Sequence, residues 1–269
     1  MHRVLFAPLA VLVFVPSVWA HYSMLLPDKP SVKKGEEVTF TYQWGHPFEH
    51  ELFDAPLPPR TFVLAPDGTK TAIALKKVNV ANGEKKVIVG HTFRFTPQQR
   101  GDYVVVVQAQ PIWMEDEQEY FQDIVKVVLH VQAQKGWDQP ADLEEGEREM
   151  DITPLTRPYG LQAGMVFQAE VAAIDGAAKK ARQPLAKTLV ETERYNSTSP
   201  KKLPPDEHIT RATKTDANGV ATCTLPETGW WCVAAQRDGG KMKHEGKEFL
   251  VRQRAILWVF VDESSKGDK

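Results

Sequence analysis

Val38-Thr39-Phe40-Thr41-Tyr42 and Tyr103-Val104-Val105-Val106-Val107 carry the signal that decides the fold of this chain. Both runs consist of β-branched and aromatic residues, which pack well on the pleated surface of a sheet. Similar runs follow along the chain, and turn sequences such as Pro66-Asp67-Gly68 and Asn82-Gly83 separate them. Short strands at this spacing predict antiparallel β-sandwich architecture.

The predicted strands form two groups on either side of an acid-rich segment, residues 136–153. The strands are expected at 38–42, 61–64, 91–95, 103–107 and 124–131, then at 165–172, 188–195, 209–213, 220–225, 231–235 and 255–261. The acid-rich segment offers few residues able to fill a core, so we interpret it as a solvated linker. The sequence therefore predicts an all-β protein with two immunoglobulin-like sandwich domains, residues 21–135 and 154–262, and a polar tail, 263–269.

Residues 1–20 have the pattern of a secretory signal peptide. Met1-His2-Arg3 is a short basic start, residues 4–15 are largely apolar, and Ala20 suits the position before a signal-peptidase cut. The apolar stretch is shorter than the ~20 residues that span a bilayer. We expect cleavage after Ala20, a periplasmic location, and a mature chain that begins with the free α-amine of His21.

The charge balance and the cysteines limit the class of protein. The formal net charge is -2, which argues against nucleic acid or an anionic membrane surface as the main partner. After residue 20 we find no stretch long and apolar enough for a transmembrane helix. Cys223 and Cys232 are the two cysteines, and a four-residue turn at 226–229 would place them opposite each other across a hairpin. We therefore predict a structural disulfide.

A compact histidine run, Gly45-His46-Pro47-Phe48-Glu49-His50-Glu51, follows the first predicted strand. Gly45 and Pro47 disfavour a helix there, so a loop is expected to turn the side chains towards one point. The predicted metal ligands are His21, His46, His50, Glu49 and Glu51. Imidazole and amine nitrogens suit nickel, cobalt, copper and zinc, and the general affinity order puts copper first.

Five segments together resemble the bacterial periplasmic proteins associated with nickel and cobalt uptake. The segments are Ala20-His21, residues 45–56, residues 154–160, residues 215–219 and Gly229-Trp230-Trp231. This resemblance spans nearly the whole mature chain, and the histidine run is its most specific part. It implies a soluble component that binds nickel or cobalt and works with a membrane uptake transporter, and it does not imply catalysis. Thr215-Asp216-Ala217-Asn218-Gly219-Val220 also resembles the turn of carboxypeptidase-regulatory-like sandwich modules.

Two other functions stay open on the residues alone. An N-terminal histidine with a second histidine can form a copper brace, which would make the protein a copper carrier or an oxidative enzyme. The two sandwich domains would alternatively form an adhesion or scaffold module that needs no metal. We find none of the common hydrolase, metalloprotease or phosphate-binding motifs in the mature sequence, so we expect no catalysis.

Other candidate groups have a plainer interpretation. We read His91, His130, His208 and His244 as surface or hydrogen-bonded histidines, since none lies in a tight ligand motif. Residues 115–119, with four acids, are expected to be a solvated face, although they would also suit oxygen ligands or an acidic approach for cations. Residues 215–220 lack the full set of acids for a calcium loop and are predicted to form a tight turn.

Overall fold

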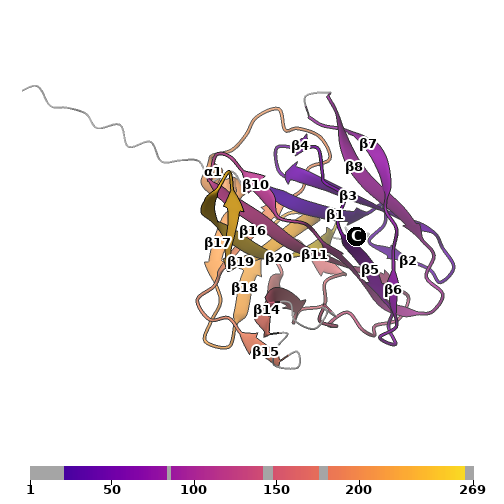
Figure 1. The fold of residues 1–269 in the computed structure, drawn as a ribbon. Coiled ribbons are helices and arrows are strands. Elements are labelled where there is room, and N and C mark those ends of the chain that lie inside the picture. The colour runs from indigo at the N-terminus through magenta and orange to yellow at the C-terminus, as the bar shows by residue number, and fades with distance from the viewer. Residues whose placement is uncertain (1–20, 84–85, 142–147, 176–180, 264–269) are drawn as a thin grey trace, which may run out of the picture.

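The computed structural model describes residues 21–83, 86–141, 148–175 and 181–263. The all-β prediction is confirmed: three sheets with mostly antiparallel pairing account for the described chain, apart from the short helix α1 (Asp206–Ile209) and the loops (Figure 1). The described part includes no helix long and apolar enough to cross a membrane. The predicted signal peptide and residues 264–269 of the predicted tail lie outside the described residues.

The N-terminal sheet has five strands. Its order is β1-β3-β8-β7. β8 pairs with residues 38–42 of β3, and β4 pairs with residues 44–46 at the end of the same strand. The strands are β1 (Tyr22–Pro27), β3 (Val38–His46), β4 (Glu51–Phe53), β7 (Lys76–Ala81) and β8 (Val87–Phe95). In β3 the residues Phe40, Tyr42 and Trp44 alternate with Thr39, Thr41 and Gln43, so the two sets point to opposite faces of the sheet.

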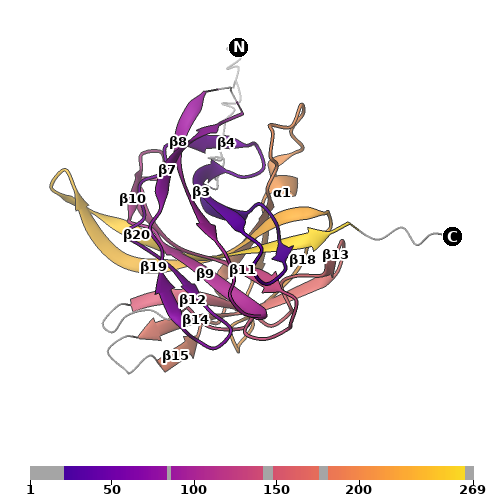
Figure 2. The same ribbon diagram turned by 90° about the vertical axis from the view of Figure 1, so that its right-hand side faces the viewer.

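The central sheet has eleven strands and contains segments from both halves of the sequence. Its main order is β17-β16-β19-β20-β11-β9-β5-β6, while β10 and β2 pair with β11, and β13 pairs with β20. The strands are β2 (Ser31–Val32), β5 (Arg60–Leu64), β6 (Lys70–Ala72), β9 (Gly101–Gln108), β10 (Ile112–Met114), β11 (Glu119–Val131), β13 (Leu161–Gln162), β16 (Leu189–Arg194), β17 (Arg211–Lys214), β19 (Gly229–His244) and β20 (Lys247–Asp262). The β19–β20 hairpin extends beyond the body of the molecule (Figure 2).

The C-terminal sheet covers the side of the central sheet that faces away from the N-terminal sheet. Its strands are β12 (Arg148–Pro154), β14 (Val166–Asp175), β15 (Ala181–Pro184) and β18 (Val220–Thr224). Along β19, Cys232 and Ala234 belong to the core beneath the N-terminal sheet, whereas Trp231 and Val233 belong to the core beneath the C-terminal sheet. The middle of the central sheet is therefore buried on both faces, which explains the continuous apolar run 255–261 in β20.

The two predicted domains share this central sheet. β11, from the first predicted domain, pairs in parallel with β20, from the second, over Tyr120 to Val127. The division into residues 21–135 and 154–262 stays a prediction, but the structure differs from it in the segment between them. Residues 149–153 belong to β12 and are buried, whereas we expected them in a solvated linker. Residues 142–147 of that linker lie outside the described residues.

The predicted disulfide is corrected by the structure, in which Cys223 and Cys232 are both free. The residues between them do not close a hairpin; they carry the chain from one sheet to another. Cys223 in β18 lies opposite Phe167 of β14, while Cys232 in β19 lies between Glu193 and Trp258. The two thiols consequently lie in cores on different faces of the central sheet.

We expect both thiols to be present in the unreduced protein and to react slowly while it is folded. Burial raises the pKa of Cys223 to about 11 and that of Cys232 well above its usual value, and the thiolate is the reactive form. Alkylation followed by mass spectrometry would show two added groups only after denaturation in guanidinium chloride. A denatured, unreduced chain that takes up no alkylating reagent would show that the two cysteines are bonded after all.

Candidate functional site

The structure brings His21 and His46 together at one end of the N-terminal sheet. β1 and β3 pair antiparallel with Tyr22 opposite Gly45, and continuing this register by one residue sets His21 opposite His46. Residues directly opposite in an antiparallel pair lie on the same face of the sheet. The two imidazole centroids are 4.0 Å apart, so side chains 25 positions apart in sequence form one pair.

Two aromatic side chains of the same sheet enclose this histidine pair. The ring of His21 stacks on Trp44 with centroids 5.0 Å apart and lies 5.3 Å from the ring of Phe53. Trp44, which is 8% exposed, has no hydrogen-bond acceptor for its indole Nε1 within the described residues. The site therefore combines two imidazoles with an apolar wall and one indole N–H that is available to an added acceptor.

Burial keeps His46 in the form that binds metals. His46 is 3% exposed, and burial lowers the pKa of its imidazole to about 3, with a further lowering by His21. A neutral imidazole offers a nitrogen lone pair, whereas an imidazolium offers none. His46 is thus neutral over the physiological pH range and needs to lose no proton before it coordinates a cation.

The two predicted carboxylate ligands differ in position. Glu51 of β4 is paired directly with His46 of β3, so its side chain belongs to the same face as the histidines. Glu49 lies in the turn before β4 and is half-buried. Burial raises the pKa of Glu49, and the charges of Glu51 and Asp206 raise it further. Glu51 is therefore the acid that the sheet register places beside the histidine pair.

The third predicted histidine takes a different position. His50 has a left-handed backbone, with φ 54°, and its ring meets that of Tyr195 edge to face at 5.8 Å. Burial lowers the pKa of His50, and the backbone of Ala81 and Asn196 partly offsets this effect. Across the described ranges, no group of three or more His, Cys, Asp or Glu side chains is arranged to hold a metal ion.

The loop that carries the histidine run is fastened to the second half of the chain. The backbone N–H of Phe48 donates to Glu193 Oε1 at 3.1 Å, and Asn196 donates to the carbonyl oxygens of Phe48 and Pro47 at 2.6 and 3.0 Å. Thr210 donates to the other oxygen of Glu193 at 2.7 Å. Burial raises the pKa of Glu193 to about 8. Sequence reasoning missed Glu193 and Asn196 because no local motif signals a contact between segments about 145 positions apart.

The other four histidines of the described residues match their plainer interpretation. Three of them bond to a neighbour and the fourth is exposed. The contacts are His91 to the Ala55 carbonyl, His130 to Asp102 and His244 to Tyr120, with His208 exposed in α1.

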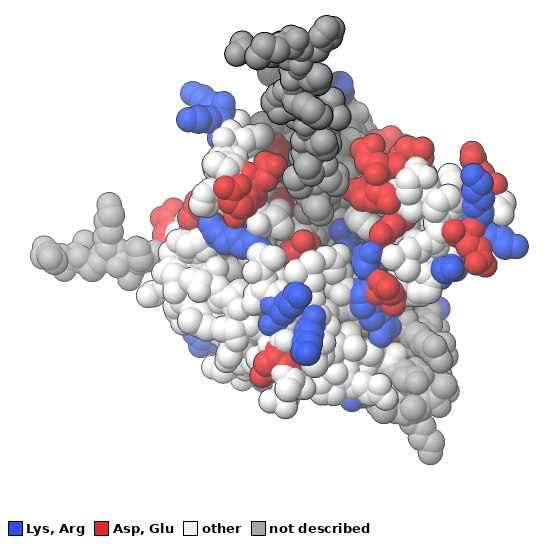
Figure 3. Space-filling model, turned by 90° about the vertical axis from the view of Figure 1, so that its left-hand side faces the viewer, with Lys and Arg blue, Asp and Glu red and all other residues white. Residues whose placement is uncertain are grey.

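Two acids of the run 115–119 form a hydrogen bond and an ion pair near the β19–β20 hairpin. Glu115 accepts a hydrogen bond from Trp113, and Glu119 pairs with Arg252. Figure 3 shows acidic and basic side chains interspersed over one face of the molecule.

The predicted turn at residues 215–220 is confirmed. Asp216 Oδ1 accepts hydrogen bonds from the backbone N–H groups of Asn218 and Val220, each at 2.8 Å, and Gly219 has φ 75°. This is the local bonding by which an Asp side chain stabilises a tight turn.

Comparison with known proteins gives a family and distant structural likenesses. A family model described as "Domain of unknown function (DUF4198)" matches residues 18–239. No curated protein matches the chain.

Among solved structures, the chain is similar to trypsin-activated alpha-2-macroglobulin from Escherichia coli, at 14% identity over 91% of this chain and 16% of that one, with a TM-score of 0.28. It is also similar to a DUF4785 family protein from Legionella pneumophila, at 11% identity over 80% and 53%, with a TM-score of 0.28. The chain thus spans only part of the length of these proteins, and likeness at these scores carries no argument about function.

Proposed function

We propose that this chain, which belongs to the DUF4198 family of unknown function, binds a divalent transition metal ion at the His21–His46 pair and passes it to a membrane uptake transporter. The pairing of the two imidazoles, with centroids 4.0 Å apart, is the observation that carries the proposal. Nickel and cobalt are the favoured metals because of the resemblance of the histidine run to uptake proteins. Copper and zinc are the alternatives on chemistry alone.

The donor set grows if signal cleavage leaves His21 as the first residue. Its α-amine and its imidazole then lie in one residue and can chelate the same cation, while His46 supplies a second imidazole. Three nitrogens suit the square-planar or tetragonal preferences of nickel(II) and copper(II). Glu51, on the same sheet face, is the oxygen donor best placed to join them. The apolar wall of Trp44 and Phe53 would limit the access of water to the bound ion.

The second half of the chain has a positioning role in this proposal. Glu193 and Asn196 fix the backbone at Phe48 and Pro47, directly after His46. A transporter that binds near Glu193 and Asn196 would therefore act on the position of the loop after His46 through these hydrogen bonds. Delivery, the periplasmic location and the transporter are part of the proposal.

The test is a titration that compares two N-termini. Mature protein beginning at His21 and a version with one added alanine before His21 would each be titrated with nickel, cobalt, copper and zinc by calorimetry. The added residue turns the α-amine into an amide, so we expect metal affinity to fall at least about tenfold. Equal affinity of the two versions for every metal would show that the α-amine is not a ligand. Absence of binding by both would favour a metal-free adhesion or scaffold role.

A copper function is the second candidate, and the same pair of histidines supports it. A terminal histidine and a nearby second histidine are the ligands of a copper brace, which carries copper or activates oxygen with an added reductant. Electron paramagnetic resonance of the copper-loaded protein would show a tetragonal signal if the three nitrogens bind Cu(II). Turnover with oxygen and a reductant would then distinguish an oxidative enzyme from a carrier.

A further inference from the structure

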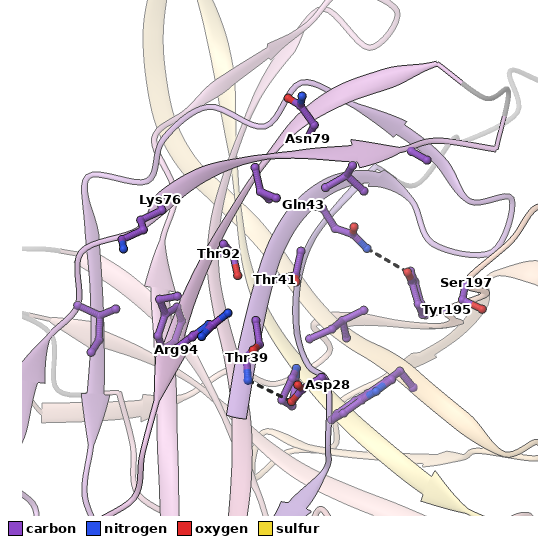
Figure 4. A pocket seen from close by; sticks show the side chains of 18 of the residues that line it. Asp28, Thr39, Thr41, Gln43, Lys76, Asn79, Thr92, Arg94, Tyr195 and Ser197 are labelled. Atoms are coloured by element: carbon purple, nitrogen blue, oxygen red, sulfur yellow. Dashed lines mark hydrogen bonds between the residues drawn. The ribbon is translucent and has the colours of Figure 1, made fainter. Parts of the chain in front are cut away.

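A groove lies over the face of the N-terminal sheet that points away from the histidine pair. Its volume is about 1310 Å³. Thr39, Thr41 and Gln43 of β3 form part of its floor, and they alternate with the residues that share the face of His46. Figure 4 shows these three side chains along β3, with Tyr195 and Ser197 of the second half across from Gln43. The groove is therefore separate from the candidate metal site.

The lining combines neutral polar groups with apolar side chains. Hydroxyls come from Thr39 and Thr41 of β3, from Thr92 of β8 and from Ser197, and one amide comes from Gln43. Thr92 donates to the Phe40 carbonyl at 2.8 Å, which leaves its oxygen lone pairs as acceptors. Hydroxyl and amide side chains both donate and accept hydrogen bonds, so this floor suits a ligand whose own groups do the same.

Aromatic rings stand at one end of the groove. Tyr195 is held by Gln43, whose amide donates to the tyrosine oxygen at 3.2 Å. Trp230 is half-buried, and its ring packs edge to face on Phe260 at 5.1 Å. Trp230 also lines an adjoining hollow of about 410 Å³, together with Tyr195 and Ser197. A fixed, partly exposed indole offers an apolar platform at the point where the two hollows meet.

The charges along the groove nearly cancel. Asp28 accepts the backbone N–H of Thr39 at 3.1 Å, and Arg94 pairs with Glu37 at 3.3 Å. Lys76 is the remaining charged side chain in the lining. This balance offers no field that would select an anion or a strongly charged peptide, and it favours an uncharged ligand.

We propose that this groove binds an uncharged oligosaccharide. The hydroxyls of Thr39, Thr41 and Thr92 and the Gln43 amide match the hydroxyls of sugar rings, and the half-exposed indole of Trp230 matches their apolar C–H faces. The volume exceeds the ~300–1,000 Å³ of sites for drug-sized ligands, so several sugar units would occupy it. An extended peptide fits less well: a peptide that joins a sheet pairs with an edge strand, here β7 at the margin of the groove, and would leave the side chains of the floor on β3 unused.

Three uncharged hexasaccharides would serve as probes: cellohexaose, N-acetylchitohexaose and maltohexaose. Calorimetric titration of the mature protein is expected to show binding of at least one of them in the micromolar to low millimolar range. Thr41→Val removes a hydroxyl at nearly constant volume and Ser197→Ala removes an exposed hydroxyl, so each is expected to weaken binding several-fold. Trp230→Ala is expected to weaken it by about tenfold or more.

Thr71→Val is the matched control, because Thr71 is exposed on β6 and does not line the groove. It is expected to leave sugar affinity unchanged. Since Trp230→Ala removes a packed ring, circular dichroism would establish that this variant folds, and the Thr41 and Ser197 variants test the proposal independently. The proposal is overturned if none of the three sugars binds at about 5 mM, or if a sugar binds equally well to all groove variants. Binding of an uncharged extended peptide in place of every sugar would also overturn it.

Discussion

Replacing His46 with alanine is expected to weaken binding of nickel, cobalt and copper by more than about a hundredfold. The variant removes one of two imidazoles whose centroids lie 4.0 Å apart, and the metal then keeps only the donors of His21 and any oxygen from Glu51. Loss of one ligand from a chelate also disturbs the geometry that the other ligands serve. Calorimetric titration of the mature variant, with a competing chelator for tight metals, would measure the change.

Two further histidine variants make this result specific. His208→Ala changes an exposed residue of α1 and is expected to leave affinity unchanged. His50→Ala is expected to have a smaller effect than His46→Ala, because the ring of His50 packs against Tyr195. Circular dichroism would check that the buried site of His46 tolerates the change. If His46→Ala binds every metal as tightly as the unmodified protein, the proposed site is wrong.

The strands that the sequence revealed are those with continuous apolar or β-branched runs. β9 and β11 lie in the central sheet, where both faces are buried, so each contains a mainly apolar run, 103–107 in β9 and 124–131 in β11. β7 was missed because it is an edge strand in which Lys76, Lys77 and Asn79 are exposed. Local composition carries little signal for such a strand, since its pairing with β8 supplies the order.

The candidate site could be predicted only in part. Composition and spacing singled out His21, His46 and His50, but they could not say which of these meet. The register between β1 and β3 brings His21 to His46, and the left-handed backbone at His50 directs that residue elsewhere. Strand register depends on partners distant in sequence, so residue types alone do not contain it.

The acid-rich segment shows the same limit for charged residues. We interpreted the acids of residues 138–151 as solvated, yet Glu149 and Asp151 are buried in β12. Glu149 accepts hydrogen bonds from Gln108, and Asp151 forms an ion pair with Lys126 of β11. A buried acid is stable only with such a partner, and the partners lie about 25 to 41 positions earlier in the sequence.

The ion pair of Lys126 and Asp151 leads to the second large expected effect. Lys126 Nζ lies 2.5 Å from Asp151 Oδ1, Arg182 donates to Oδ2 at 2.6 Å, and the exposed fractions of the Lys126 and Asp151 side chains are 1% and 0%. Asp151→Ala would leave the lysine charge buried without its partner, which costs about 3–5 kcal/mol. For a chain of this size we expect the midpoint of thermal unfolding to fall by roughly 10 °C.

Acid should weaken the unmodified protein through the same group. Although burial opposes it, the charges of Lys126 and Arg182 lower the pKa of Asp151 from 3.8 to about 2. The carboxylate therefore contributes stability that is fully present above pH ~4 and is lost as the pH falls towards ~2, an effect of roughly 2 kcal/mol. Denaturant unfolding between pH 6 and pH 2.5 should show this loss in the unmodified protein and a smaller one in Asp151→Ala.

A double variant separates the cost of an unpaired charge from the value of the pair. Lys126→Met with Asp151→Leu replaces both ionic partners with apolar side chains, and Arg182 keeps its contact with Glu170 at 3.3 Å. Because burying two charges is itself costly, the double variant is expected to recover most of the stability that Asp151→Ala loses. Urea unfolding of the three proteins at pH 7 would measure this. If the double variant is as unstable as Asp151→Ala, the ion pair itself stabilises the fold. The explanation that Asp151→Ala is unstable because Lys126 is left buried without a partner would then be wrong.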